Sequence, residues 1–175
     1  MKATKTIMAL AAIASTMFII GCDDLPTPEK MKSISIVIGK TAGYACELAK
    51  TKEEVKDGIL AILDVAATVV PNEKQTFTEA WTPVIDDELK KLVEKGKIEE
   101  GEVAIAKLAL SAATEGIDYV FVKYPKARDV KELVSTATEG FVNGFKSVVA
   151  FARDVKPDID EEAYKYIKAR MAASK

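Results

Sequence analysis

Acidic residues form the densest groups of side chains that could take part in catalysis. They occur at positions 86–88 (Asp-Asp-Glu) and at positions 99, 100 and 102, which are all Glu. Paired carboxylates are what glycoside hydrolysis requires, so a carboxylate-dependent hydrolase is one interpretation. Both groups are expected in the first turn or so of a helix, where acids favour the positive end of the helix dipole. Helix capping and solvation are therefore the preferred roles.

Other catalytic and cofactor chemistries lack their usual residues. The chain contains no histidine, which excludes Ser-His-Asp and Cys-His catalysis and histidine-ligated zinc or haem. Gly39-Lys40-Thr41 is similar to the end of a nucleotide-binding Walker loop, but Ile34 stands where that loop needs its first glycine. No glycine-containing loop with alternating acids suits calcium. We therefore predict no catalytic residue, no metal site and no cofactor.

An internal repeat places small and hydroxyl residues at matching positions. Segments 111–116 (SAATEG) and 135–140 (STATEG) match at five of six positions. If they lie on two consecutive antiparallel helices, the copies should face each other. Glycine within a helix costs about 1 kcal/mol relative to alanine, and close approach of two backbones would explain it. Gly116, Gly140 and Gly144 are thus expected to form a helix-packing seam.

The hydroxyl groups of the same repeat allow an alternative. Ser111, Thr114, Ser135 and Thr138 could line a small cavity that holds a ligand. Hydroxyls in helices can instead donate hydrogen bonds to carbonyls of the preceding turn, in which case they line no cavity. Tight helix packing is the preferred interpretation.

Aromatic residues provide the candidates for a contact surface. Phe77 and Trp81 lie four residues apart, and Trp combines apolar area with a polar tip that suits protein interfaces. We name this pair as a possible partner surface, beside the alternative that both residues are half-buried in the core.

The charge balance argues against nucleic acid as a partner. The formal net charge is -2, and without Lys2 and Lys5 there are 23 basic residues against 27 acidic ones. A nucleic-acid binder would show a basic excess and a basic stripe. Neither is present in the sequence.

The N-terminus has the order of a secretory signal. Two lysines precede an uncharged stretch at 6–20, which is short for a membrane-spanning helix. The stretch ends in Ile19-Ile20-Gly21-Cys22, which resembles the lipobox of bacterial lipoproteins, although Leu is commoner where Ile19 stands. An ordinary signal cut after Ala14 and an uncleaved anchor are the alternatives.

The lipoprotein resemblance implies a particular maturation and address. The thiol of Cys22 would receive a diacylglycerol, and the chain would be cut immediately before Cys22, which would become the first residue. The lipid would be the membrane contact. In enteric bacteria an Asp at the position of Asp23 keeps such proteins at the inner membrane, on its periplasmic face. Lipidation would leave Cys46 unpaired, and its small apolar neighbours predict a buried structural thiol.

The mature chain is predicted to be all-α, with one domain. Residues 1–21 are assigned to the signal peptide, 22–30 to the lipidated cysteine and an extended tether, and 31–175 to the helical domain. Apolar residues recur at spacings of three and four, which predicts five or six helices. These are expected at 32–50, 53–70, 83–94 after a short turn, 98–123, 129–153 and from 158 or 160 onward, with 98–123 and 129–153 forming a central antiparallel hairpin.

These features favour a lipid-anchored interaction or scaffold module of the bacterial cell envelope, acting by binding an unidentified protein. The alternatives are a small-ligand carrier built around the repeat, an exclusion or immunity lipoprotein of phage type and, least favoured, the hydrolase. Since no catalytic motif is recognised, we do not expect an enzyme.

Overall fold

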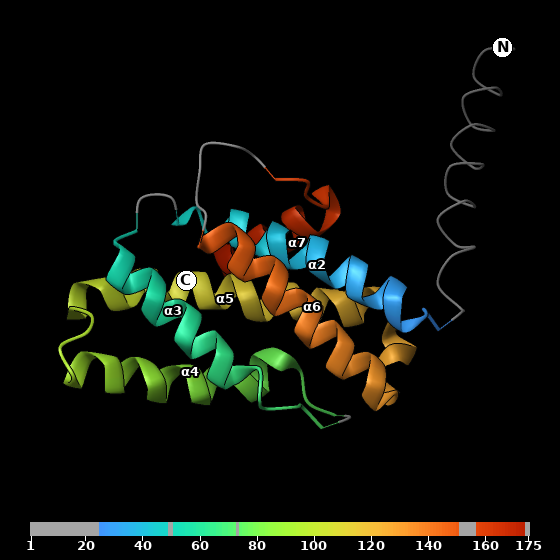
Figure 1. Ribbon diagram of the computed structural model, residues 1–175, viewed down its shortest axis with the longest axis horizontal. Helices are drawn as coiled ribbons and strands as arrows, with labels where there is room; N and C mark the ends of the chain where they lie inside the picture. Colours follow the sequence, from blue (N-terminus) through green and yellow to red (C-terminus); the bar gives the residue numbers. More distant parts are fainter. Residues whose placement is uncertain (1–24, 49–50, 73, 151–156, 174–175) are drawn as a thin grey trace, which may run out of the picture.

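The computed structural model describes residues 25–48, 51–72, 74–150 and 157–173. The expected signal peptide and Cys22 lie outside the described residues. Within the described ranges the regular structure is entirely helical, as the sequence predicts. The elements in these ranges are α2 (Pro28–Ala45), α3 (Glu53–Ala66), α4 (Phe77–Glu94), α5 (Glu100–Lys123), the 3-10 helix η2 (Pro125–Asp129), α6 (Lys131–Val149) and α7 (Glu161–Ala173) (Figure 1).

The first described helix begins earlier than expected. α2 starts at Pro28, with Thr27 as its N-cap accepting a hydrogen bond from the Lys30 backbone N–H at 3.3 Å. Proline is favourable at the first helical position, because its missing N–H has no partner there and its φ suits the helix. The extended segment expected to reach Lys30 therefore ends at Thr27.

The third helix is longer than the sequence suggests. α4 runs from Phe77 to Glu94 without interruption, although we expected a short turn and then a new helix at Pro83. The start of α4 is fixed by a capping box, in which Thr76 accepts from the Glu79 N–H at 3.1 Å. Burial of Phe77 and Trp81 holds the turns before Pro83 in place, and Pro83 itself is exposed. Packing thus outweighs the proline penalty.

The tightest helix contact joins α2 to α6. A Cβ atom added at Gly140 would lie 2.8 Å from the Lys32 carbonyl oxygen, and one added at Gly144 would overlap the Ile36 carbonyl oxygen. One added at Gly39 would overlap the Phe141 carbonyl. Gly140 lies opposite Lys32, and Gly144, one turn later, lies opposite Ile36, so the two helices run parallel (Figure 1). We call this close approach, made by Gly39, Gly43, Gly140 and Gly144, the α2–α6 seam.

The expected pairing of Gly116 with Gly140 is wrong. A Cβ atom at Gly116 would meet the ring of Phe141 at 2.8 Å and the Cβ of Ala42 at 2.9 Å. The physical reason is that α2 supplies its own glycines, which lets the backbones of α2 and α6 approach closely. α5 and α6 follow one another through η2, but α6 packs mainly on α2.

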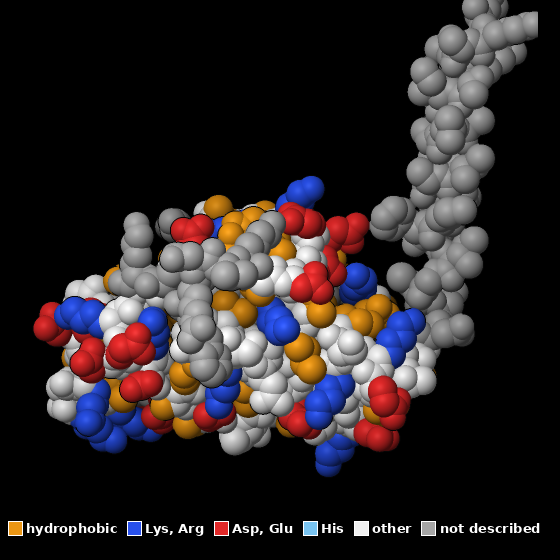
Figure 2. Space-filling model, turned by 45° about the horizontal axis from the view of Figure 1, so that its top comes forward, with side chains coloured by type: hydrophobic (Ala, Val, Ile, Leu, Met, Phe, Trp, Pro, Cys, Tyr) orange, Lys and Arg blue, Asp and Glu red, His pale blue; other side chains and the backbone are white. Residues whose placement is uncertain are grey.

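The second half of α5 is the centre of the domain. Residues 112–121 are all buried, which agrees with the prediction that this most apolar stretch lies inside. α5 contacts α2, α3, α4, α6 and α7. In Figure 1 it runs between α4, which lies below it, and α2, which lies above it. On the face in Figure 2, acidic and basic side chains are interspersed around small hydrophobic groups.

Candidate functional site

Phe77 and Trp81 form no surface for a partner. Their exposed fractions are 2% and 0%. Phe77 contacts the Trp81 ring edge-on at 5.2 Å between centroids and stacks on Phe121 at 5.4 Å. The indole N–H of Trp81 donates to the Val69 carbonyl at 2.9 Å, so its polar tip is satisfied inside the protein. The partner-surface hypothesis for this pair is therefore wrong, and the half-buried alternative understates their burial.

The hydroxyls of the repeat do not converge on one cavity. Ser111 and Thr114 line a hollow of about 160 Å³ beside α4, whereas Ser135 and Thr138 line a separate one of about 330 Å³ beside α3. The hydroxyls of Thr114 and Thr138 also donate to carbonyls of their own helices, at 3.1 and 2.8 Å. The single ligand cavity, which was the alternative interpretation of the repeat, is therefore not formed by these four residues.

The acidic run at 86–88 lies in the middle of α4, because that helix begins earlier than expected. All three of its carboxylates form ion pairs with lysines. Asp86 pairs with Lys107 at 2.8 Å, and Lys91 pairs with both Asp87 and Glu88 at 2.6 and 2.7 Å. The two lysines thus offset most of the negative charge of the three acids at the surface.

The second acidic group does open a helix. Glu102 accepts from the Glu99 backbone N–H at 2.9 Å and pairs with Lys52 at 2.7 Å. The Glu99 N–H and then the Lys52 ammonium lower the pKa of the Glu102 carboxyl. No grouping of acids and thiols suited to a metal ion occurs in the described ranges.

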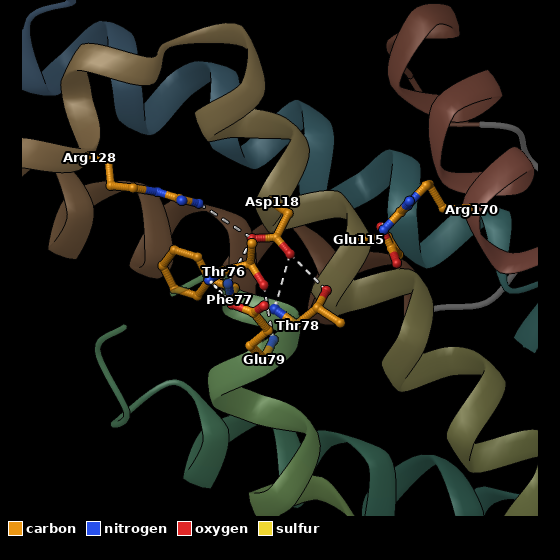
Figure 3. A network of polar contacts seen from close by, with 8 residues as sticks. All are labelled: Thr76, Phe77, Thr78, Glu79, Glu115, Asp118, Arg128 and Arg170. Atoms are coloured by element: carbon orange, nitrogen blue, oxygen red, sulfur yellow. Dashed lines mark hydrogen bonds and ion pairs between the residues drawn. The ribbon is translucent and has the colours of Figure 1, made fainter. Parts of the chain in front are cut away.

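A buried carboxylate that the sequence analysis missed, Asp118, accepts several hydrogen bonds. It projects from α5 to the start of α4 (Figure 3) and is 7% exposed. Its carboxylate accepts from the Phe77 N–H at 2.7 Å, from the Thr78 N–H at 3.0 Å and from the Thr78 hydroxyl at 2.7 Å. Two acids within the most apolar stretch, Glu115 and Asp118, were the available signal, because a buried charge requires such partners.

Two arginines from other elements complete this network (Figure 3). Arg128, in η2, lies 3.7 Å from the Asp118 carboxylate and 5.7 Å from the centre of the Phe121 ring. Arg170, in α7, donates to Glu115 at 3.1 Å, and this contact raises the pKa of its guanidinium. Glu115, one turn before Asp118 on α5, is also only 7% exposed.

These residues border a groove of about 360 Å³, which we call the network groove. Tyr166 lies in its wall, and burial raises the pKa of its phenol. Each buried carboxylate is already held by hydrogen bonds or a guanidinium, which suits it to fixing structure rather than to exchanging protons with a substrate. The network ties α4, η2 and α7 to α5.

A second hollow, of about 510 Å³, lies on the other side of Arg128. We call it the basic hollow, because Lys74, Arg128 and Lys131 line it with Asp129 as the acid among its lining residues. Val70, which is 56% exposed, and Val134 supply apolar wall. The charged residues that line the basic hollow carry a net positive charge, and Arg128 connects the hollow to the network around Asp118.

The remaining thiol behaves as the sequence predicts. Cys46 is 8% exposed, and its thiol donates to the Gly43 carbonyl at 2.8 Å. Burial raises the pKa of this thiol to about 12. Cys46 is therefore a structural residue of the core.

Comparison with known proteins finds no matching family model, no similar curated protein and no similar solved structure. None of the helices in the described part of the chain has the length and hydropathy needed to cross a membrane.

Proposed function

We propose that this chain is a lipid-anchored helical module of a bacterial cell envelope, which acts by binding a protein partner. The observation that carries the proposal is the sequence Ile19-Ile20-Gly21-Cys22 after an uncharged stretch with a basic start. Such an order is typical of a lipoprotein signal, and acylation of Cys22 would hold the domain at a membrane. Asp23 would keep it on the periplasmic face of the inner membrane in a host that sorts by this residue.

The domain behind the anchor supports a binding role. It has a closely packed helical core, and the two acids that are buried in its described part, Glu115 and Asp118, are engaged by arginines and by the start of α4. A rigid scaffold with committed carboxylates suits presentation of a surface better than hydrolysis.

The test of the anchor is the substitution Cys22→Ser. In a bacterial host, the parent should appear in the detergent phase and carry a diacylglyceryl group by mass spectrometry. The variant should accumulate as an unprocessed precursor or a soluble product. Cys46→Ala is the matched control, since it removes the other cysteine and should leave the lipid in place. Mature parent protein with an unmodified Cys22 would overturn the proposal.

A further inference from the structure

The end of the bundle that carries the start of α2 must lie close to the membrane if Cys22 is acylated. Pro28 follows Cys22 by six positions, with five residues between them, and such a segment spans at most roughly 22 Å in any conformation. Because α2 and α6 run parallel, the start of α6 lies at this same end (Figure 1). We call it the anchor end.

The basic hollow lies at the anchor end. Lys131 is the first residue of α6, Arg128 lies in η2 just before it, and Lys74 reaches the hollow from the connection between α3 and α4. Elsewhere many lysines are paired, such as Lys32 with Glu139 and Lys146 with Asp64. Lys74 and Lys131 are exposed and make no ion pair with described residues.

We propose that the anchor end is a docking surface for anionic phospholipid headgroups, with Lys74, Arg128 and Lys131 as its contacts. The inference rests on the lipid anchor of the proposed function. Charge complementarity favours this occupant, because basic side chains are attracted to a negatively charged bilayer surface. Exposed Val70 would lie against the interfacial region. The lipid would then fix the orientation of the domain as well as its location.

A fluorophore close to Lys131 can report the orientation of the full-length, acylated protein. Ser135 is exposed one turn after Lys131, so Ser135→Cys can be labelled with bimane, while buried Cys46 remains unlabelled. The protein is placed in vesicles of phosphatidylcholine with or without phosphatidylglycerol, each containing a headgroup-nitroxide lipid as quencher. Gly101→Cys, at the start of α5 and far from the anchor end in Figure 1, is the control label.

We expect phosphatidylglycerol to increase quenching at position 135 and to leave position 101 unchanged. Lys74→Glu with Lys131→Glu should abolish most of the increase, since the loss of each lysine charge alone weakens docking about fivefold and each new glutamate is also repelled by the anionic surface. Salt near 0.5 M should do the same by screening. The matched control is Lys95→Glu with Lys97→Glu, which makes the same charge change at the connection between α4 and α5 and should have no effect.

Flotation with the vesicles separates the two proposals. A chain that floats with neither vesicle type overturns the lipid anchor and the docking end together. The docking end alone is overturned if the chain floats with both vesicle types but quenching at position 135 is the same with and without phosphatidylglycerol. It is also overturned if quenching is the same in the parent and in the variant with both lysines reversed.

Discussion

At Gly144 the backbone of α6 lies against the Ile36 carbonyl of α2, and an added methyl group would overlap that oxygen. We expect Gly144→Ala to lower the free energy of unfolding by about 1 to 3 kcal/mol, because overpacking must push two backbones apart. The gain in helix propensity, about 1 kcal/mol, opposes this loss without cancelling it. Urea melts of the chain from residue 25 onward measure the difference.

Gly101 provides the control for this substitution. An added Cβ atom there meets nothing within 4 Å, and the residue is exposed in the first turn of α5. Gly101→Ala should therefore stabilise the protein by up to about 1 kcal/mol, the opposite sign. A Gly144→Ala protein as stable as the parent would show that the α2–α6 seam can open without cost.

The sequence showed where glycines share a helix face but not which helix each face meets. Spacing of four residues places Gly140 and Gly144 on one side of α6, as it does Gly39 and Gly43 on α2. The repeat suggested Gly116 as the partner, since consecutive helices often pack together. Partner choice instead depends on which two surfaces fit most closely, and that information is spread over distant segments.

The start of α4 depends on a side chain from another element. We expect Asp118→Ala to lower the free energy of unfolding by about 2 to 3 kcal/mol, because the N–H groups of Phe77 and Thr78 lose their acceptor in a buried place. Chemical denaturation followed by circular dichroism measures this.

The comparison variant is Glu79→Ala, which removes the exposed half of the capping box on the same helix. It should cost less than about 1 kcal/mol. Equal effects of the two substitutions would contradict a special role for the buried carboxylate.

At the level of elements, periodicity predicted the helices well and their ends less well. The all-α class and the central position of α5 follow from apolar spacing, which is a local property. Two errors fall at Pro28 and Pro83, where proline was taken as a boundary, and α2 and α3 end at Ala45 and Ala66, before the expected positions 50 and 70. The Asp118 network could not be predicted, because it joins α4, α5 and η2 through contacts that only the tertiary structure creates.

For the molecule as a whole, the rate at which the Cys46 thiol reacts with a reagent reports whether the domain is folded. In the folded state burial raises the pKa of its thiol to about 12, so little thiolate forms and access is blocked. With Cys22 acylated or replaced, we expect reaction with a thiol reagent at pH 8 to be at least about 100-fold slower in buffer than in denaturing urea.

Labelling of an exposed thiol at Ser135→Cys in the same conditions supplies the reference rate. Fast labelling of Cys46 in buffer would mean that the end of α2 opens readily, contrary to its burial among core residues.

The parallel pairing of α2 with α6 also sets an order of events during synthesis. Lys32 and Glu139, which pair across these helices, are 107 residues apart, so α2 leaves the ribosome long before its main partner exists. Contacts of such long sequence separation form late, because a long loop must first be closed. In the exported precursor that we propose, the helix directly behind the signal peptide would therefore stay unpaired while the chain is threaded through a translocation channel.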